Sequence, residues 1–218
     1  MKHKNLIALM YGFAAIPVIT LLLVYGKLPE MIPTNFGFDG TVNAYGPRYT
    51  IIMLALLPAF LAAMMQFLPK IDPRRQAYVK FQKYYVFFAV FMTAFMTVVF
   101  FMIVSETLHP GTVSIGRIMT AMIACMFIVI GNMMGKIKHN YLFGIKTPWT
   151  LADPDVWVRT HSLGGKIWFI MGILLLPAAL LMKEQVFFWL LMVGVIGSVI
   201  LLFAVSYLFY RQKARDEE

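Results

Sequence analysis

Six long apolar runs constrain this chain more than any other feature of its sequence. Each is close to the roughly 20 residues that a helix needs to cross the hydrocarbon core of a bilayer. Because lipid offers no hydrogen-bond partners, such segments cross as helices that bond their own backbone groups. The predicted spans are residues 6–25, 49–68, 85–104, 115–134, 167–182 and 186–210. We therefore expect an all-α, polytopic membrane protein with six transmembrane helices.

The composition agrees with this class of protein. The chain is 61% hydrophobic and 13% charged, whereas about a quarter of the residues in a soluble domain are charged. The net charge of +9 lies beside the apolar runs, so it indicates orientation in a bilayer and no direct binding of nucleic acid. The first run is longer than the apolar region of a signal peptide, so we expect a retained helix. These features predict a multi-pass protein of the cell membrane with lipid as its first partner.

Lysine and arginine counts predict the orientation of the spans. Fifteen of these residues fall on one side and four on the other. The first side holds Lys2, Lys4, Lys70, Arg74, Arg75, Lys80, Lys83, Lys136, Lys138, Lys146, Arg159, Lys166, Arg211, Lys213 and Arg215; the other holds Lys27, Arg48, Arg117 and Lys183. Because cytoplasmic loops carry the positive excess, we expect both termini to be cytoplasmic. An even number of spans gives the same result.

The predicted spans carry no Asp, Glu, Lys or His near their centres. Ion and proton pathways use such residues, and an intramembrane hydrolase needs a buried catalytic pair. This pattern argues against a transporter and an enzyme, and it implies no cofactor. Both remain as alternatives, because an apolar cavity can handle a lipid-like substrate.

The loop of residues 27–48 falls on the outer side in this orientation. Turn-forming residues are frequent in it, among them Gly37, Gly40, Gly46, Asp39 and Asn43, so we expect a structured reverse-turn loop. Its tyrosines, Tyr45 and Tyr49, are suited to the headgroup level. The candidate outer-loop residues are Pro29, Pro33, Asn35, Asp39, Gly40 and Tyr45.

A polar segment, residues 140–166, lies on the cytoplasmic side within the loop 135–166. Asp153 is suited to cap a helix, Pro154 to its first position and Asp155 to its positive end. We expect a short helix from there to about Leu163, ended by two glycines and lying along the membrane surface.

Residues spaced four apart on that helix share a face, as Trp157 and His161 do. We interpret Trp149, Trp157 and His161 as a recognition surface presented by the Thr147-Pro148 turn. The alternative is that the tryptophans only anchor the loop among the headgroups. No zinc-binding spacing joins His161 to His139, Asp153 or Asp155, so we predict neither a metal nor a catalytic group.

Several short motifs resemble the SdpI family. They are Gly131-Asn132, Asn140-Tyr141, Gly144-Ile145-Lys146-Thr147-Pro148-Trp149-Thr150-Leu151, Val156-Trp157, Thr160-His161 and Gly164-Gly165-Lys166. The outer loop resembles the domain of unknown function that often precedes this family, through Leu28-Pro29, Ile32-Pro33, Phe36, Gly40 and Tyr45-Gly46. Relatives often carry His where this chain has Asn35, which weakens a metal or acid–base interpretation of the outer loop. The resemblance implies a two-helix unit at residues 1–69 and a four-helix SdpI-like unit at residues 70–218.

The resemblance also implies a function. Family members protect a cell from a secreted antimicrobial toxin and can sequester a transcriptional regulator at the membrane. We therefore expect a non-enzymatic immunity and signalling protein, with a peptide toxin met outside and a cytoplasmic regulator met inside. The residues implied in partner binding are Asn140, Gly144, Lys146, Thr147, Pro148, Trp149, Thr150, Asp153, Trp157, Thr160 and His161.

Overall fold

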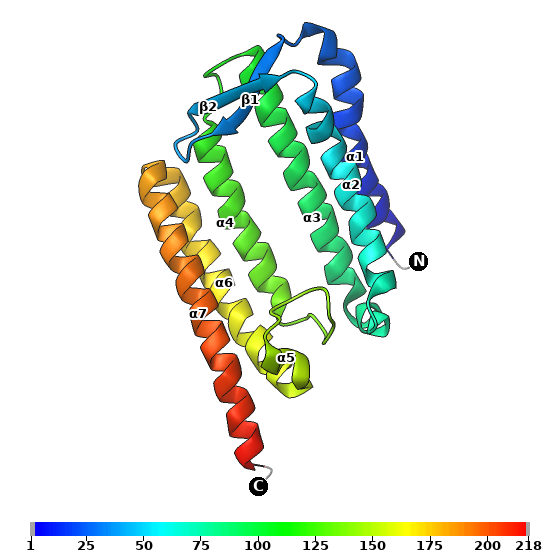
Figure 1. Ribbon diagram of the computed structural model, residues 1–218, viewed down its shortest axis with the longest axis vertical. Helices are drawn as coiled ribbons and strands as arrows, with labels where there is room; N and C mark the ends of the chain where they lie inside the picture. Colours follow the sequence, from blue (N-terminus) through cyan, green and yellow to red (C-terminus); the bar gives the residue numbers. More distant parts are fainter. Residues whose placement is uncertain (1–2, 217–218) are drawn as a thin grey trace. The chain divides into compact units, whose positions relative to one another are not determined.

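The computed structural model describes residues 3–216 and is mainly helical (Figure 1). Within these residues, six helical segments are long and apolar enough to cross a membrane. The helices are α1 (Lys4–Val24), α2 (Thr50–Ile71), α3 (Arg75–Leu108), α4 (Ile115–Met134), α5 (Pro148–Ala152), α6 (Pro154–Leu181) and α7 (Glu184–Asp216), with a 3₁₀ turn η1 (Tyr25–Lys27). The all-α membrane architecture with six spans is confirmed, and the chain is a multi-pass membrane protein. The orientation of the termini stays a prediction, and Lys2, which entered the charge count, lies outside the described residues.

The expected spans and the observed helices differ mainly in length. The fourth span, α4, has the expected bounds, whereas α3, α6 and α7 extend well past the apolar runs. Polar residues continue a helix readily outside lipid, so the apolar run sets where the membrane lies and not where the helix ends. The helical path of α3 is interrupted once, at Phe81, where φ is −127° and ψ is 21°.

The chain forms two compact units, and neither is continuous in sequence. Unit 1 comprises Met1–Phe67 with Tyr85–Met119, and unit 2 comprises Leu68–Tyr84 with Thr120–Glu218. The division at residues 69 and 70 that the family resemblance implied therefore stays a prediction.

Unit 1 contains a β-hairpin that was not expected. Strand β1 (Met31–Phe36) pairs antiparallel with β2 (Val42–Pro47), and the register shifts on both sides of Asn35. In the turn, the Gly37 N–H donates to the Thr41 carbonyl at 2.8 Å, and Asp39 accepts from the Thr41 N–H and hydroxyl. The turn residues were recognised, but the strands were missed because prolines and glycines weaken the strand pattern.

The hairpin is tied to the helices of its own unit. Ile32 is buried, and it joins a core of Leu21, Leu28, Ile51, Ala55, Phe100 and Val104 from α1, α2, α3 and the segment after η1. Gly40 has φ +80°, and a side chain there would clash with the backbone of Gly116 at the start of α4. The hairpin is therefore ordered by packing on one side and keeps its other side exposed.

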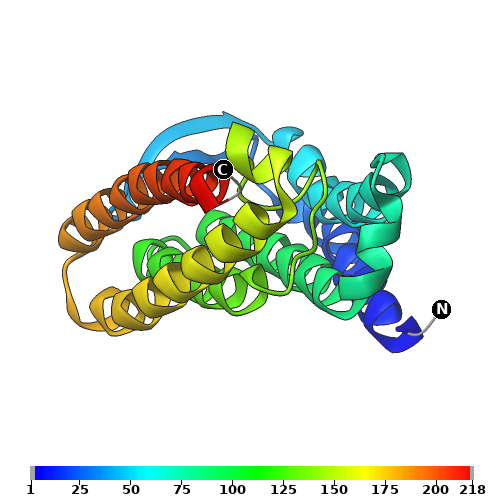
Figure 2. The same cartoon turned by 90° about the horizontal axis from the view of Figure 1, so that it is seen from below.

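Unit 2 contains most of α4 with all of α6 and α7; α5, the loop before it and the turn between α2 and α3 also belong to it (Figures 1 and 2). Its core contains Ala124, Leu175, Ala178, Ala179, Phe187 and Leu191. Helices α4 and α6 approach to backbone contact, since a Cβ on Gly131 would collide with the backbone of Phe169 and one on Gly172 with Ile128. Small residues permit such close packing between membrane helices.

The expected short helix ending at Gly164-Gly165 is wrong. Helix α6 runs without a break from Pro154 to Leu181, so the surface helix and the fifth span are one element. Both glycines are buried: a Cβ on Gly165 would lie 2.9 Å from the Gly131 carbonyl oxygen, and one on Gly164 would press on Ile145 and Leu202. The pair therefore allows close packing and does not end the helix.

Candidate functional site in the loop before α6

Asn140 organises the loop between α4 and α6. Its side chain is fully buried, and its Oδ1 accepts from the N–H groups of Leu142 and Phe143 at 3.0 and 2.6 Å. Its Nδ2 donates to the carbonyls of Lys138 and Phe143, both at 2.8 Å. Both the oxygen and the nitrogen of the Asn140 side chain are hydrogen-bonded to backbone groups of the same loop. The side chain therefore satisfies amides and carbonyls that no helix or strand satisfies here.

Asp72 fixes this loop to the turn between α2 and α3. It is 2% exposed, and its Oδ2 accepts from the N–H groups of Tyr141 and Leu142 at 3.0 and 3.2 Å. The Tyr78 hydroxyl lies 3.1 Å from both this carboxylate and the Asn140 Oδ1, so its single proton is shared between them. A buried carboxylate needs several donors, and here the loop backbone supplies them.

Sequence reasoning missed Asp72 and Tyr78 as parts of the site. A signal was present, because Asp72 is the only acidic residue in a loop otherwise rich in lysine and arginine. Its partners could not be inferred, since they lie 69 and 70 residues away in the chain.

Trp157 and His161 form a buried stack under the loop. Their rings lie 3.9 Å apart between centroids at 19°, and the two residues are 0% and 1% exposed. The Trp157 Nε1–H donates to the Ile137 carbonyl at 3.0 Å. The shared helix face was predicted correctly, but the idea that these two residues form an accessible surface is wrong.

The hydrogen bonds of His161 define its tautomer. Its Nε2 accepts from the Ile145 N–H at 2.9 Å, so that nitrogen carries no proton. Its Nδ1 lies 2.9 Å from the Trp157 carbonyl, to which it must therefore donate. Because both nitrogens are occupied, His161 positions the loop and has no free lone pair for a metal. No group of three His, Cys, Asp or Glu residues among residues 3–216 could hold a metal ion.

Gly144 is required by this arrangement. Its φ is +126°, a region that side chains disfavour, and a Cβ there would collide with the His161 Nε2 and lie 3.0 Å from the Trp157 ring. The loop backbone thus lies directly on the stacked rings.

The Thr147-Pro148 turn begins the short helix α5 through a reciprocal cap. The Thr147 hydroxyl accepts from the Thr150 N–H at 3.2 Å, and the Thr150 hydroxyl accepts from the Thr147 N–H at 2.8 Å. Thr147 has the extended conformation expected before proline (φ −104°, ψ 163°). Its hydroxyl also donates to Ser206 at 3.0 Å, which joins the turn to α7.

Helix α7 holds the other side of the same segment. The Trp149 ring packs 4.9 Å from Phe203 and 5.1 Å from Tyr207. Arg159 lies 4.0 Å above the Phe209 ring and donates to Gln212 at 3.0 Å. Trp149 is half-buried by these contacts, so it is a packing residue with one accessible edge.

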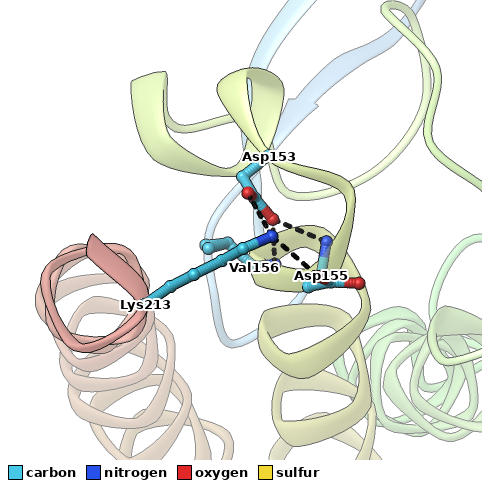
Figure 3. Close-up of polar contacts among 4 residues, drawn as sticks. All are labelled: Asp153, Asp155, Val156 and Lys213. Carbon is cyan, nitrogen blue, oxygen red and sulfur yellow. Dashed lines mark hydrogen bonds and ion pairs between the residues drawn. The ribbon is translucent and has the colours of Figure 1, made fainter. Parts of the chain in front are cut away.

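Asp153 caps α6, as predicted, and also pairs with α7 (Figure 3). Its Oδ1 accepts from the N–H groups of Asp155 and Val156 at 2.7 and 3.0 Å. Lys213 lies 2.7 Å from the Asp153 carboxylate and 2.8 Å from that of Asp155. Burial raises the pKa of Asp153, but the hydrogen bonds from Lys213 and the two amides outweigh it and hold this pKa below 3.8.

The structure brings the predicted inner residues together in unit 2 but divides them by exposure. Asn140, Thr147, Thr150, Trp157, Thr160 and His161 are buried, whereas Lys146 and Pro148 are exposed; Gly144, Trp149 and Asp153 are intermediate. The outward surface also includes Tyr141 and Val158, which were not predicted.

The predicted outer residues all lie on or beside the hairpin of unit 1. Asn35, Asp39 and Tyr45 are exposed, and Pro33 is buried. The Asn43 Nδ2 donates to Asn35 at 3.3 Å across the strands. Hydrogen bonds from Thr41 hold the pKa of Asp39 below its usual value. This end of unit 1 is therefore a small ordered surface with polar and aromatic groups.

The spans and the ordered connecting segments define a multi-pass membrane protein whose polar groups are gathered between its helices. Residues 136–208 match the SdpI/YfhL protein family, and residues 12–61 match a domain of unknown function, DUF1648. The chain is 22% identical over 212 residues to Immunity protein SdpI of Bacillus subtilis (strain 168). The aligned region covers 96% of this chain and 97% of that protein. No solved structure matches. The resemblance to the SdpI family is thereby confirmed.

Proposed function

We propose that this chain is a non-enzymatic immunity protein of the cell membrane, which protects its cell from a secreted peptide toxin. The observation that carries this proposal is similarity to an immunity protein along nearly the whole of both chains. The similarity includes the hairpin and the ordered loop as well as the six spans. A role that used only one of these parts would not need the whole length.

The hairpin is the segment proposed to meet the toxin. Its exposed side carries Tyr45, which is 60% exposed, and Phe38 at the turn, which is 50% exposed. Aromatic residues with accessible faces are frequent at the centres of protein interfaces. The hairpin is also anchored by buried Ile32, so it presents these residues from a fixed backbone.

The loop before α6 is the segment proposed to meet a cytoplasmic regulator. Its buried residues fix the backbone, so recognition falls to the exposed Tyr141, Lys146, Pro148 and Val158 and to the open edge of Trp149. This assignment replaces the surface of Trp149, Trp157 and His161. A rigid backbone lowers the entropy that a partner must overcome on binding.

Protection can be tested in a Bacillus subtilis strain that lacks its own SdpI and grows beside wild-type cells. We expect expression of this chain to restore growth of that strain. No protection by a chain that reaches the membrane at normal abundance would contradict the proposal for that toxin.

The two surfaces can be separated by matched variants in the same assay. Tyr45→Ala should reduce protection with normal abundance, whereas Tyr49→Ala, beside the hairpin and equally exposed, should not. Lys146→Ala with Val158→Ala should leave protection intact and abolish recruitment of a cytoplasmic protein by the purified membranes. Loss of protection in this inner variant would show that toxin and regulator are not met at separate surfaces.

A further inference from the structure

Arg74 lies in the turn between α2 and α3 and has no acidic partner among residues 3–216. Its guanidinium carbon is 4.5 Å from the centroid of the Tyr141 ring. Its Nη1 is buried and has no hydrogen-bond partner within residues 3–216. The two ion pairs found among residues 3–216 are both formed by Lys213. A partly buried guanidinium without an anion is unfavourable, because its charge is neither hydrated nor neutralised.

The nearest acidic residue in the sequence, Asp72, forms no ion pair with this side chain among the described residues. Its Oδ1 accepts from the backbone N–H of Arg74 at 2.7 Å, and its Oδ2 accepts from two loop amides and Tyr78. Asp72 therefore fixes the backbone of Arg74 and leaves the side chain unpaired.

His139, two residues before Tyr141, has one ring nitrogen without a partner in the described part of the chain, although its ring also makes a hydrogen bond with the backbone of Leu151. Its Nε2 is buried and has no hydrogen-bond partner among the described residues. Its pKa lies below 6.5, first because of burial and second because of the positive charge of Arg74. The ring is held against Trp157 at 4.9 Å between centroids.

Asn140 holds the loop residues on either side of it in place. It lies between His139 and Tyr141 in the chain, and its own side chain is fully bonded. The site is therefore preorganised: Asp72 fixes Arg74, and Asn140 fixes the residues on either side of it. Lys138 is exposed nearby in sequence and adds positive charge.

We propose that Arg74, stacked on Tyr141, forms a binding site for a phosphate group. The guanidinium presents donors in a planar fork that matches two phosphate oxygens, and stacking on Tyr141 orients that fork. Phosphate is favoured over a carboxylate because its larger charge complements Arg74 together with Lys138. The group is carried by an anionic lipid or is free phosphate; both have the same oxygens.

The site can be tested with full-length protein in nanodiscs. In discs of phosphatidylcholine, inorganic phosphate is titrated by calorimetry; in discs that also contain phosphatidylglycerol, retained anionic lipid is counted by native mass spectrometry. We expect wild-type protein to bind one probe saturably and Arg74→Gln to weaken that binding at least about tenfold. The matched control is Arg75→Gln, which removes an exposed neighbour and should change binding less than about twofold.

Each outcome decides the proposal. Saturable phosphate binding assigns the site to the free anion, and selective retention of phosphatidylglycerol assigns it to a headgroup. Binding of neither probe, or equal binding by wild type and Arg74→Gln, overturns it. If Arg74→Gln does not fold, Arg74→Lys, which keeps the charge and loses the fork, takes its place. Wild-type binding by this variant also overturns the proposal.

Discussion

Stacked rings and one glycine determine the conformation of the loop at the level of single residues. Trp157 and His161 fill the space beneath the loop, and Gly144 lets the backbone lie on them. The tautomer of His161 follows from two hydrogen bonds to backbone groups. In the sequence these residues resemble a functional site, but their contacts in the structure serve to fix the conformation of the loop.

Substitution of Gly144 by alanine should destabilise the protein. The added methyl group collides with His161, and φ of +126° is unfavourable for alanine, so we expect a loss of at least about 1 kcal/mol. Thermal unfolding in detergent measures the effect. Gly135→Ala is the control, because its Cβ meets only the Ser162 Cα at 3.8 Å. Equal stability of the two variants would contradict this role of Gly144.

Loss of the His161 side chain should loosen the loop. His161→Ala leaves the Ile145 N–H without its partner, which costs about 1–3 kcal/mol. Faster proteolysis within residues 135–153 is the expected result. Ser162→Ala, at an exposed neighbouring position, should be cleaved like the wild type. Unchanged protection of the loop in His161→Ala would argue that Asn140 and Asp72 suffice to hold it.

Helix α6 combines two roles at the level of elements. Its first turns are capped by Asp153 and packed on α7, and its later turns cross the membrane against α4. Helix α7 runs past the apolar region, and its last turns hold the segment from Thr147 to Arg159. Order in the loop therefore depends on contacts from two transmembrane helices.

The two aspartates at the start of α6 should differ in importance. Asp153→Ala removes the cap and one carboxylate of the Lys213 pair, so we expect a loss of about 1 kcal/mol and faster amide exchange in the first turn. Asp155→Ala removes an exposed surface pair and should change stability by less than about 0.5 kcal/mol. Hydrogen exchange with mass spectrometry distinguishes them. A larger effect of Asp155→Ala would show that the ion pair outweighs the cap.

The cap should also respond to acid. Because the pKa of Asp153 is lowered in the folded protein, its contribution is complete above the unfolded value, near 3.8, and is lost as the pH falls through the folded pKa. We expect exchange at Asp155 and Val156, corrected for the intrinsic rate, to rise in that acidic range. In Asp153→Asn, which keeps a capping oxygen without the charge, this pH dependence should disappear. Its persistence would assign the titration to another carboxylate.

At the scale of the whole molecule, the six long apolar helices are the segments that cross the membrane. The hairpin follows the first span and the ordered loop follows the fourth. If every span crosses the bilayer, these two segments lie on opposite sides of it. The lysine and arginine count predicts that the loop is the one on the cytoplasmic side.

Cysteine labelling in intact cells tests this orientation. In a Cys125→Ser background, an impermeant maleimide should label a cysteine at Asp39 and should not label one at Asp155. Both positions are exposed, so accessibility within the protein does not decide the result. Labelling of both should follow permeabilisation. Reaction at Asp155 in intact cells would reverse the orientation.

The sequence predicted features that depend on local rules and missed those that depend on distant contacts. The bounds of α4 and the Asp153 cap follow from an apolar run and from capping chemistry. The Gly164-Gly165 stop failed because packing against α4 overrides a local preference for ending a helix. Asp72 and Asn140 could not be paired in advance, since nothing in their neighbourhoods shows which loops meet.

The inward direction of the loop motif has a consequence for how relatives diverge. Its buried residues pack against and hydrogen-bond to one another, so a substitution at any one of them disturbs the loop whatever the loop binds. The side chains at the exposed positions between them, such as Lys146, Val158 and Ser162, face solvent or a binding partner. Homologues can therefore retain the same signature while their partners change, and specificity should be sought in the exposed residues of this loop.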